Sequence, residues 1–127
     1  MDQTIIQSED LLNPSHWPVQ AAIGLYEGGA SDLPQIAANA AAGEGTYMDD
    51  CCISFWEDLD EYEKSQEELF EVSCDVVNDS CSLSYAEFGH YLEIACSRYA
   101  LRHPETADQF EKALNAYRKT FLQRTRD

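Results

Sequence analysis

The stretch from Asp49 to Asp79 constrains the fold of this chain most, because it combines a heptad-like apolar pattern with a dense run of acids. With Cys52 at position a, the a and d places carry mostly apolar residues: Cys52, Phe55, Leu59, Tyr62, Gln66, Leu69, Ser73 and Val76. This spacing puts side chains on one stripe of a helix. The twelve acidic residues of the stretch fall on other positions, and Lys64 is its one basic residue. The pattern predicts an acidic amphipathic helix over 47–77.

Capping signals help to define the helices of the chain. A capping box at Ser65 and Glu68 leaves open whether the acidic stretch forms one helix or two. Upstream, the sequence predicts short helices from Pro18 to Gly28, and from Ser31 or Asp32 to Gly43.

Two long amphipathic helices are predicted downstream of the acidic stretch. The first begins at the capping box of Ser84 and Glu87 and ends before Pro104, which opens the second. Their apolar seams repeat at spacings of three and four: Tyr85, Phe88, Leu92, Ala95 and Tyr99, then Ala107, Phe110, Leu114, Tyr117 and Phe121. No alternating strand pattern is evident. The predicted fold is therefore all-α, an antiparallel helical bundle of about five helices, the last three long and amphipathic.

The 127 residues suit a single helical domain, 1–127, in which residues 1–15 form a loosely packed N-terminal arm. The formal net charge is −16, and no Lys or Arg precedes Lys64. Such a field repels nucleic acid and anionic lipid and attracts basic surfaces. The absence of a charged leader and of a long apolar run predicts a cytoplasmic protein without a membrane span.

Catalytic and metal sites have little support in the sequence. Glu87 and His90 form an E-x-x-H pair, but di-iron bundles need a second such pair and further glutamates. No nucleophile has an adjacent base, and no phosphate-binding glycine loop is present. The five cysteines include no C-x-x-C pair, so buried reduced thiols are expected. We predict no catalytic residue, no metal and no cofactor, and hence a protein that is not an enzyme.

The acidic face itself is the candidate site. Solubility charges usually mix both signs, whereas this stretch has twelve acids and one base. Trp56 at its margin serves either helix packing or an interface. The predicted partner-binding residues are Asp49, Asp50, Trp56, Glu57, Asp58, Asp60, Glu61, Glu63, Glu67, Glu68, Glu71 and Asp75.

In its acidic helix, DDCCISFWEDLDEYEKSQEELFE, and its overall character, the chain resembles bacterial immunity proteins against nuclease toxins, including those of contact-dependent growth inhibition. The resemblance implies tight binding to a basic nuclease toxin domain. Two alternatives stay open. One is a nucleic-acid mimic that inhibits a restriction or CRISPR effector, and the other is a helical adaptor or oligomeric assembly subunit.

Overall fold

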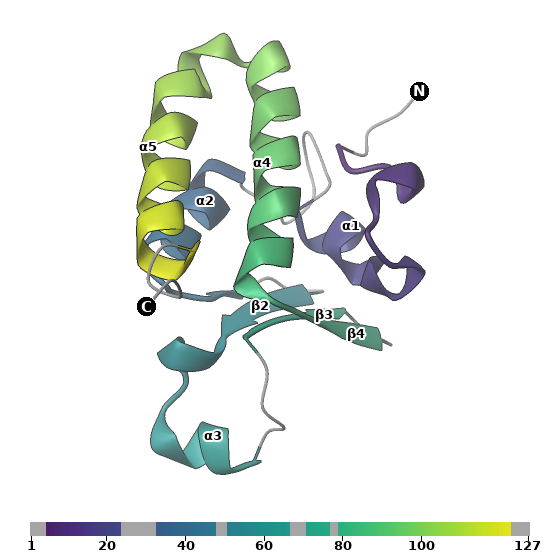
Figure 1. The fold of residues 1–127 in the computed structure, drawn as a ribbon, viewed down its shortest axis with the longest axis vertical. Helices are drawn as coiled ribbons and strands as arrows, with labels where there is room; N and C mark the ends of the chain where they lie inside the picture. Colours follow the sequence, from purple (N-terminus) through teal and green to yellow (C-terminus); the bar gives the residue numbers. More distant parts are fainter. Residues whose placement is uncertain (1–4, 24–32, 48–50, 67–70, 77–78, 123–127) are drawn as a thin grey trace.

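The protein has a sheet with helices packed on one of its faces (Figure 1). The computed structural model describes residues 5–23, 33–47, 51–66, 71–76 and 79–122. Four antiparallel strands follow one another in the order β1-β2-β3-β4. The strands are β1 (Thr46–Tyr47), β2 (Cys51–Phe55), β3 (Val72–Val76) and β4 (Asp79–Leu83). The α-helices are α1 (Pro18–Ile23), α2 (Leu33–Ala41), α3 (Glu61–Gln66), α4 (Tyr85–Arg102) and α5 (Ala107–Tyr117).

The all-α prediction is wrong, because the predicted acidic helix over 47–77 is replaced by strands and a short helix. Side chains alternate between the two faces of a strand, and the buried ones follow that period: Ile53, Phe55, Val72, Cys74, Cys81 and Leu83. Two expected seam residues show that the heptad was a coincidence. Tyr62 is 73% exposed, and Cys52 lies on the opposite side of β2 from Phe55.

The two long helices predicted after the acidic stretch are confirmed, as α4 and α5. The Ser84 hydroxyl accepts from the Glu87 N–H at 3.0 Å and the Glu87 carboxylate accepts from the Ser84 N–H at 2.8 Å, so the capping box starts α4. The helix ends at Arg102, as expected from Pro104. After it come the short 3₁₀ helix η4 (Pro104–Thr106), then α5 and a π-helical turn η5 (Arg118–Leu122).

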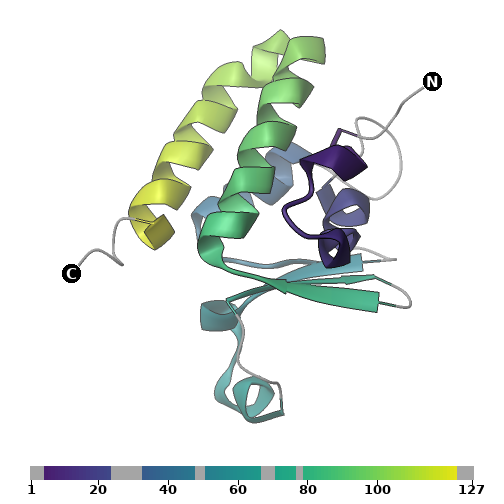
Figure 2. The same cartoon turned by 45° about the vertical axis from the view of Figure 1, so that its right-hand side comes forward.

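An aromatic cluster joins the sheet to these helices. Phe55 from β2 contacts the rings of Phe88 and Phe121, with centroids 5.6 and 5.5 Å apart. The Tyr117 hydroxyl donates to the backbone oxygen of Tyr85 at 2.6 Å, which satisfies a buried polar group. The core therefore lies between the helix-side face of the sheet and α4 and α5 (Figure 2).

The N-terminal residues, expected from the sequence to pack loosely, contribute Ile5 and Ile6 to the core with no exposed surface. The Arg98 guanidinium binds the Asp10 carboxylate at 2.6 Å, and the Tyr91 hydroxyl lies 2.8 Å from Nδ1 of buried His16. The Arg98–Asp10 ion pair and the His16–Tyr91 hydrogen bond hold the segment that contains η1 (Ser8–Asp10) and η2 (Pro14–His16) against α4.

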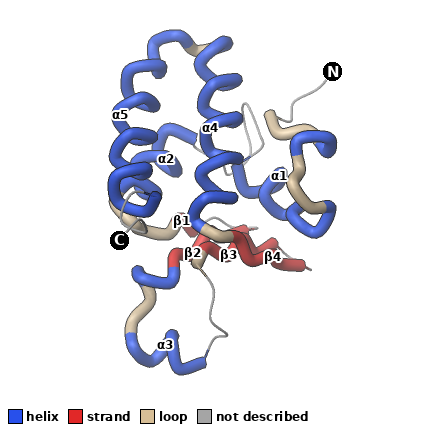
Figure 3. Tube along the Cα trace, in the orientation of Figure 1, coloured by secondary structure: helices blue, strands red, loops and turns tan. Residues whose placement is uncertain are grey.

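The connection from β2 to β3 leaves the sheet on the side away from the large helices. It contains the 3₁₀ helix η3 (Trp56–Asp58) and α3, and it projects below the strands (Figure 3). We call residues 56–71 the acidic excursion.

Candidate partner-binding site

The base of the acidic excursion is closed by the strands that carry it. The backbone N–H of Trp56 donates to the carbonyl of Glu71 at 3.1 Å. This hydrogen bond extends the β2–β3 ladder by one more pair beyond Phe55 and Val72. The excursion is therefore an insertion between two paired strands, and the sheet positions both of its ends.

Two of its carboxylates organise the short helix α3. The Asp60 carboxylate accepts from the Glu63 N–H at 2.7 Å, and the Glu63 carboxylate accepts from the Asp60 N–H at 3.2 Å. This is a capping box with aspartate at the N-cap. Asp58 accepts from the backbone N–H of Gly45 at 3.0 Å and ties η3 to the segment that leads into β1.

Other carboxylates lie at the N-terminus of α4. Glu71 accepts from the backbone N–H of Tyr85 at 2.8 Å, where the positive end of the helix dipole favours an anion. The Tyr85 hydroxyl donates to Glu57 at 3.4 Å. Burial, followed by the charge of Glu71, raises the pKa of Tyr85, so that hydroxyl stays a donor.

The charge of the excursion is almost entirely of one sign, with eight acidic residues and Lys64. The Lys64 ammonium lies 5.8 Å from the centroid of the Trp56 ring, a distance at which a cation and an aromatic face attract each other. The described carboxylates from Glu57 to Glu63 are on exposed residues. The excursion therefore presents a concentrated negative potential to solvent.

The predicted site residues are partly brought together. Trp56, Glu57 and Asp58 lie on η3, and Asp60, Glu61 and Glu63 cap or form α3. Glu71 closes the excursion and Asp75 lies on β3. Their predicted arrangement on one helical face is wrong, because they occupy short turns and a strand. The remaining four fall outside the described residues: Asp49, Asp50, Glu67 and Glu68.

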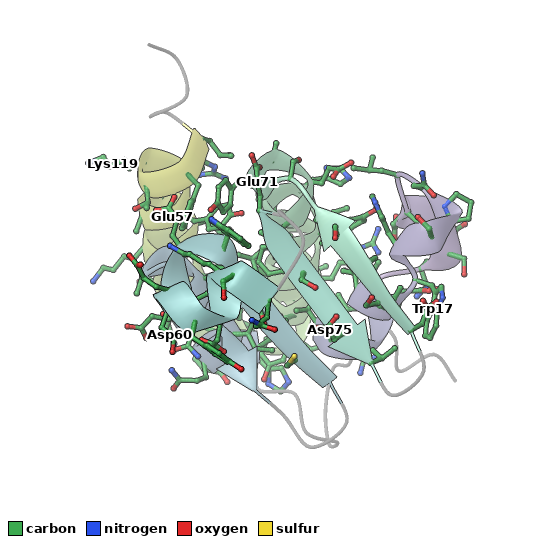
Figure 4. The ribbon with its side chains drawn as sticks, turned by 90° about the horizontal axis from the view of Figure 1, so that it is seen from below. Trp17, Glu57, Asp60, Glu71, Asp75 and Lys119 are labelled. Carbon is green, nitrogen blue, oxygen red and sulfur yellow. The ribbon has the colours of Figure 1, made fainter. Side chains whose placement is uncertain are left out.

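Sequence reasoning missed the sheet face next to the excursion. We call it the open face, made of the side chains of β2, β3 and β4 that alternate with the core residues: Cys52, Ser54, Ser73, Asp75, Ser80 and Ser82. Figure 4 looks onto this face, with Asp75 near its centre and Asp60 to one side. Serine is neither apolar nor charged, so only the strand register shows that these residues share a face.

Hydrogen bonds fix Asp75 on the open face. Its carboxylate accepts from the Ser73 hydroxyl at 3.2 Å and from the Cys52 thiol at 3.5 Å. The pairing of Cys52 with Asp75, and of Asp75 with Ser80, sets the three in one row across the strands. The negative charge of the excursion therefore continues onto the sheet at a fixed position.

Within the described ranges, no group of three or more His, Cys, Asp or Glu residues is placed to hold a metal ion. Glu87 of the E-x-x-H pair serves the α4 capping box, and His90 is exposed. No described helix is both long and apolar enough to span a bilayer.

The comparisons with known proteins identify a family. The family model described as CDI immunity protein matches residues 29–114, more than half of the chain. This chain belongs to the CDI immunity protein family. No match was found among curated proteins or among solved structures.

The family match implies a partner for this chain. An immunity protein acts on a toxin, so a cognate toxin is its partner. The matched range contains α2, the sheet, the excursion and α4. It leaves out residues 1–28, although this immunity protein uses Ile5, Ile6 and Val19 from that segment in its core.

Proposed function

We propose that this immunity protein neutralises a nuclease toxin domain by binding its basic surface with the acidic excursion. The observation that carries the proposal is the set of exposed carboxylates that projects from the sheet, in a segment whose sequence has eight acids and one base. Proteins that act on nucleic acid contact phosphates with Lys and Arg. Such a surface is complementary in sign to the excursion.

Binding alone accounts for this function, with no catalytic step by the immunity protein. Complementary charge accelerates association and suppresses wrong partners. Several of the carboxylates are also preorganised, since Asp58 and Asp60 accept backbone hydrogen bonds. Side chains that are already ordered lose less entropy on binding. We place the encounter in the cytoplasm, where thiols such as those of Cys74 and Cys96 stay reduced.

A nucleic-acid mimic built on a long acidic helix has less structural basis. The six residues of α3 make fewer than two helical turns. The described carboxylates of the excursion are thus not repeated along a rod. A compact protrusion suits a local basic cleft on a folded domain better than an extended nucleic-acid channel.

The test is a charge reversal with a matched control. The test variant carries Glu57→Lys, Asp58→Lys and Glu61→Lys, and the control carries Glu105→Lys, Asp108→Lys and Glu111→Lys on exposed positions of η4 and α5. Both make the same change in net charge. The probe is an inactivated form of the cognate toxin domain. We expect the dissociation constant to rise by about a hundredfold or more in the test variant and by less than tenfold in the control.

Ionic strength adds a second readout. Salt should slow association of the wild-type protein, because exposed charges attract each other less when screened. The dependence of the association rate on salt concentration should be weaker in the test variant. Equal affinity of the test variant and the wild type, with helicity unchanged by circular dichroism, would refute the proposal. So would a toxin that has no nuclease activity.

A further inference from the structure

We infer that the toxin docks on the open face of the sheet as well as on the acidic excursion, and that Trp17 bounds this surface on the far side. The inference rests on the proposed function, since the occupant is the same positively charged toxin domain. It assigns a docking area that the charge pattern of the sequence did not indicate.

The composition of the open face differs from that of an ordinary solvent-facing sheet. Exposed strand positions favour Thr, Tyr and Val, because these side chains cover the pleated surface. Here four of the six outward positions are serine, and the others are Cys52 and Asp75. Short side chains leave the backbone of the strands accessible to close approach, and each hydroxyl can both donate and accept.

The layout of the molecule leaves this face uncovered by its own large helices. Helices α1, α4 and α5 lie on the other face, in both views of the fold (Figures 1 and 2). The acidic excursion is on the same side as the open face and stands beside it. A partner drawn by the excursion therefore meets the serine surface next to it.

The charge of the open face fits the same partner. Asp75 is the one carboxylate among the six residues of the open face, and it is held by the Ser73 hydroxyl and the Cys52 thiol. Its fixed carboxylate offers a lone anionic group amid neutral hydroxyls. A lysine or arginine side chain of the toxin satisfies that group, with the serine hydroxyls accepting its remaining N–H donors.

Trp17 lies at the margin opposite the excursion. Figure 4 shows Trp17 and Asp60 on opposite sides of Asp75. The Trp17 indole donates to the Asp79 carboxylate at 2.8 Å, yet 42% of the residue stays exposed. Its neighbour His16 is buried against Tyr91, so the ring is attached to a fixed turn. Tryptophan is enriched among the residues that contribute most to protein interfaces.

Obstruction of the open face tests the docking area directly. Ser82→Tyr adds an aromatic ring at an exposed strand position, where tyrosine favours the strand and should leave the fold intact. The matched control is Gln109→Tyr, on the exposed side of α5. With the inactivated toxin domain as probe, we expect Ser82→Tyr to raise the dissociation constant by about tenfold or more and the control to leave it unchanged.

Truncation of Trp17 tests whether the margin of the open face takes part in binding. Trp17→Ala should weaken binding by about threefold to tenfold, because a residue at the margin of an interface contributes less than one at its centre. The control is Leu101→Ala, which truncates a side chain on a residue that is 82% exposed on α4. Denaturant unfolding of each variant confirms that a change in affinity does not reflect a change in fold.

The outcomes separate this inference from the proposed function. If Ser82→Tyr binds the toxin with wild-type affinity, the open face is not a docking area. If Trp17→Ala binds with wild-type affinity, Trp17 does not bound the docking area. Both conclusions hold even when charge reversal of the excursion abolishes binding. Weakened binding of both variants, beside unchanged controls, supports the inference. If only the charge reversal has no effect, the proposed function fails while the open face remains the toxin surface.

Discussion

The two faces of the sheet belong to the same strands and differ in almost every property. On the helix side, Phe55 and Val72 are buried in an apolar core. On the open side, their neighbours Ser54 and Ser73 pair across the strands and are half-buried, and α1, α4 and α5 lie on the opposite face of the sheet. The strand period of two therefore places core residues and outward-facing residues next to each other in the sequence. The comparison teaches that the open face can change its chemistry while the core beneath it stays constant.

The largest expected effect comes from adjacent residues on opposite faces. Phe55→Ala should lower the free energy of unfolding by about 3–5 kcal/mol, because it empties the centre of the aromatic cluster. Ser54→Ala should change it by less than about 0.5 kcal/mol. Urea unfolding monitored by circular dichroism measures both. Similar losses for the two variants would break the contrast between the faces.

The reason sequence reasoning succeeded for α4 and failed for the sheet is the length of the pattern. In α4, Phe88, Leu92 and Ala95 belong to an 18-residue helix that repeats the helical period several times. Each of β2, β3 and β4 has five residues. A strand of five residues is too short to establish an alternation, and Phe55 also fits the 3-4 seam that begins at Cys52, so the acidic run decided the interpretation wrongly.

The candidate site was predictable to the extent that it depends on composition. The excess of acids in residues 56–71 can be counted from the sequence whatever secondary structure the segment adopts. In the structure, the described residues of the excursion lie together on one projection. The open face depends on which residues pair across strands, and pairing between residues as distant as Cys52 and Asp75 is set by the tertiary fold. Trp17 is held at the edge of β4 by its hydrogen bond to Asp79, a contact between residues far apart in the chain.

Removal of a carboxylate should have opposite effects on stability in the N-terminal segment and in the acidic excursion. The hydrogen bond from Arg98 holds the pKa of Asp10 below its ordinary value of 3.8. A lowered carboxyl pKa stabilises the fold above the ordinary value, and that contribution disappears as the pH falls through the lowered one. Asp10→Asn should therefore be less stable than wild type at neutral pH, and the difference should shrink in acid.

In the excursion, Glu61→Gln removes one of several like charges, so it should leave stability at neutral pH unchanged or slightly higher. Unfolding free energies measured at neutral pH and below the ordinary pKa of 3.8 test the pair. If Glu61→Gln lowers the free energy of unfolding as much as Asp10→Asn does, the excursion contributes to stability through its charge.

The smallest effect is a difference in thiol reactivity between the faces. Cys52 is half-buried on the open face, whereas Cys96 lies in the core, where burial raises the pKa of its thiol to about 12. Alkylation followed by peptide mass spectrometry should modify Cys52 well before Cys96, since the thiolate is the reactive form. Bound toxin should slow modification of Cys52. Equal rates at the two cysteines would mean that α4 opens readily.

The hydrogen bond from Trp56 to Glu71 closes the neck of the acidic excursion. Antiparallel strands such as β2 and β3 can be joined by a turn of about two residues, and the free energy of closing a loop grows only slowly with its length. Insertions, deletions and charge swaps beyond the neck therefore leave strand pairing nearly unaffected. Under the proposed function, an immunity protein built in this way can adapt to a changed toxin by altering the excursion while the sheet and the helices stay the same.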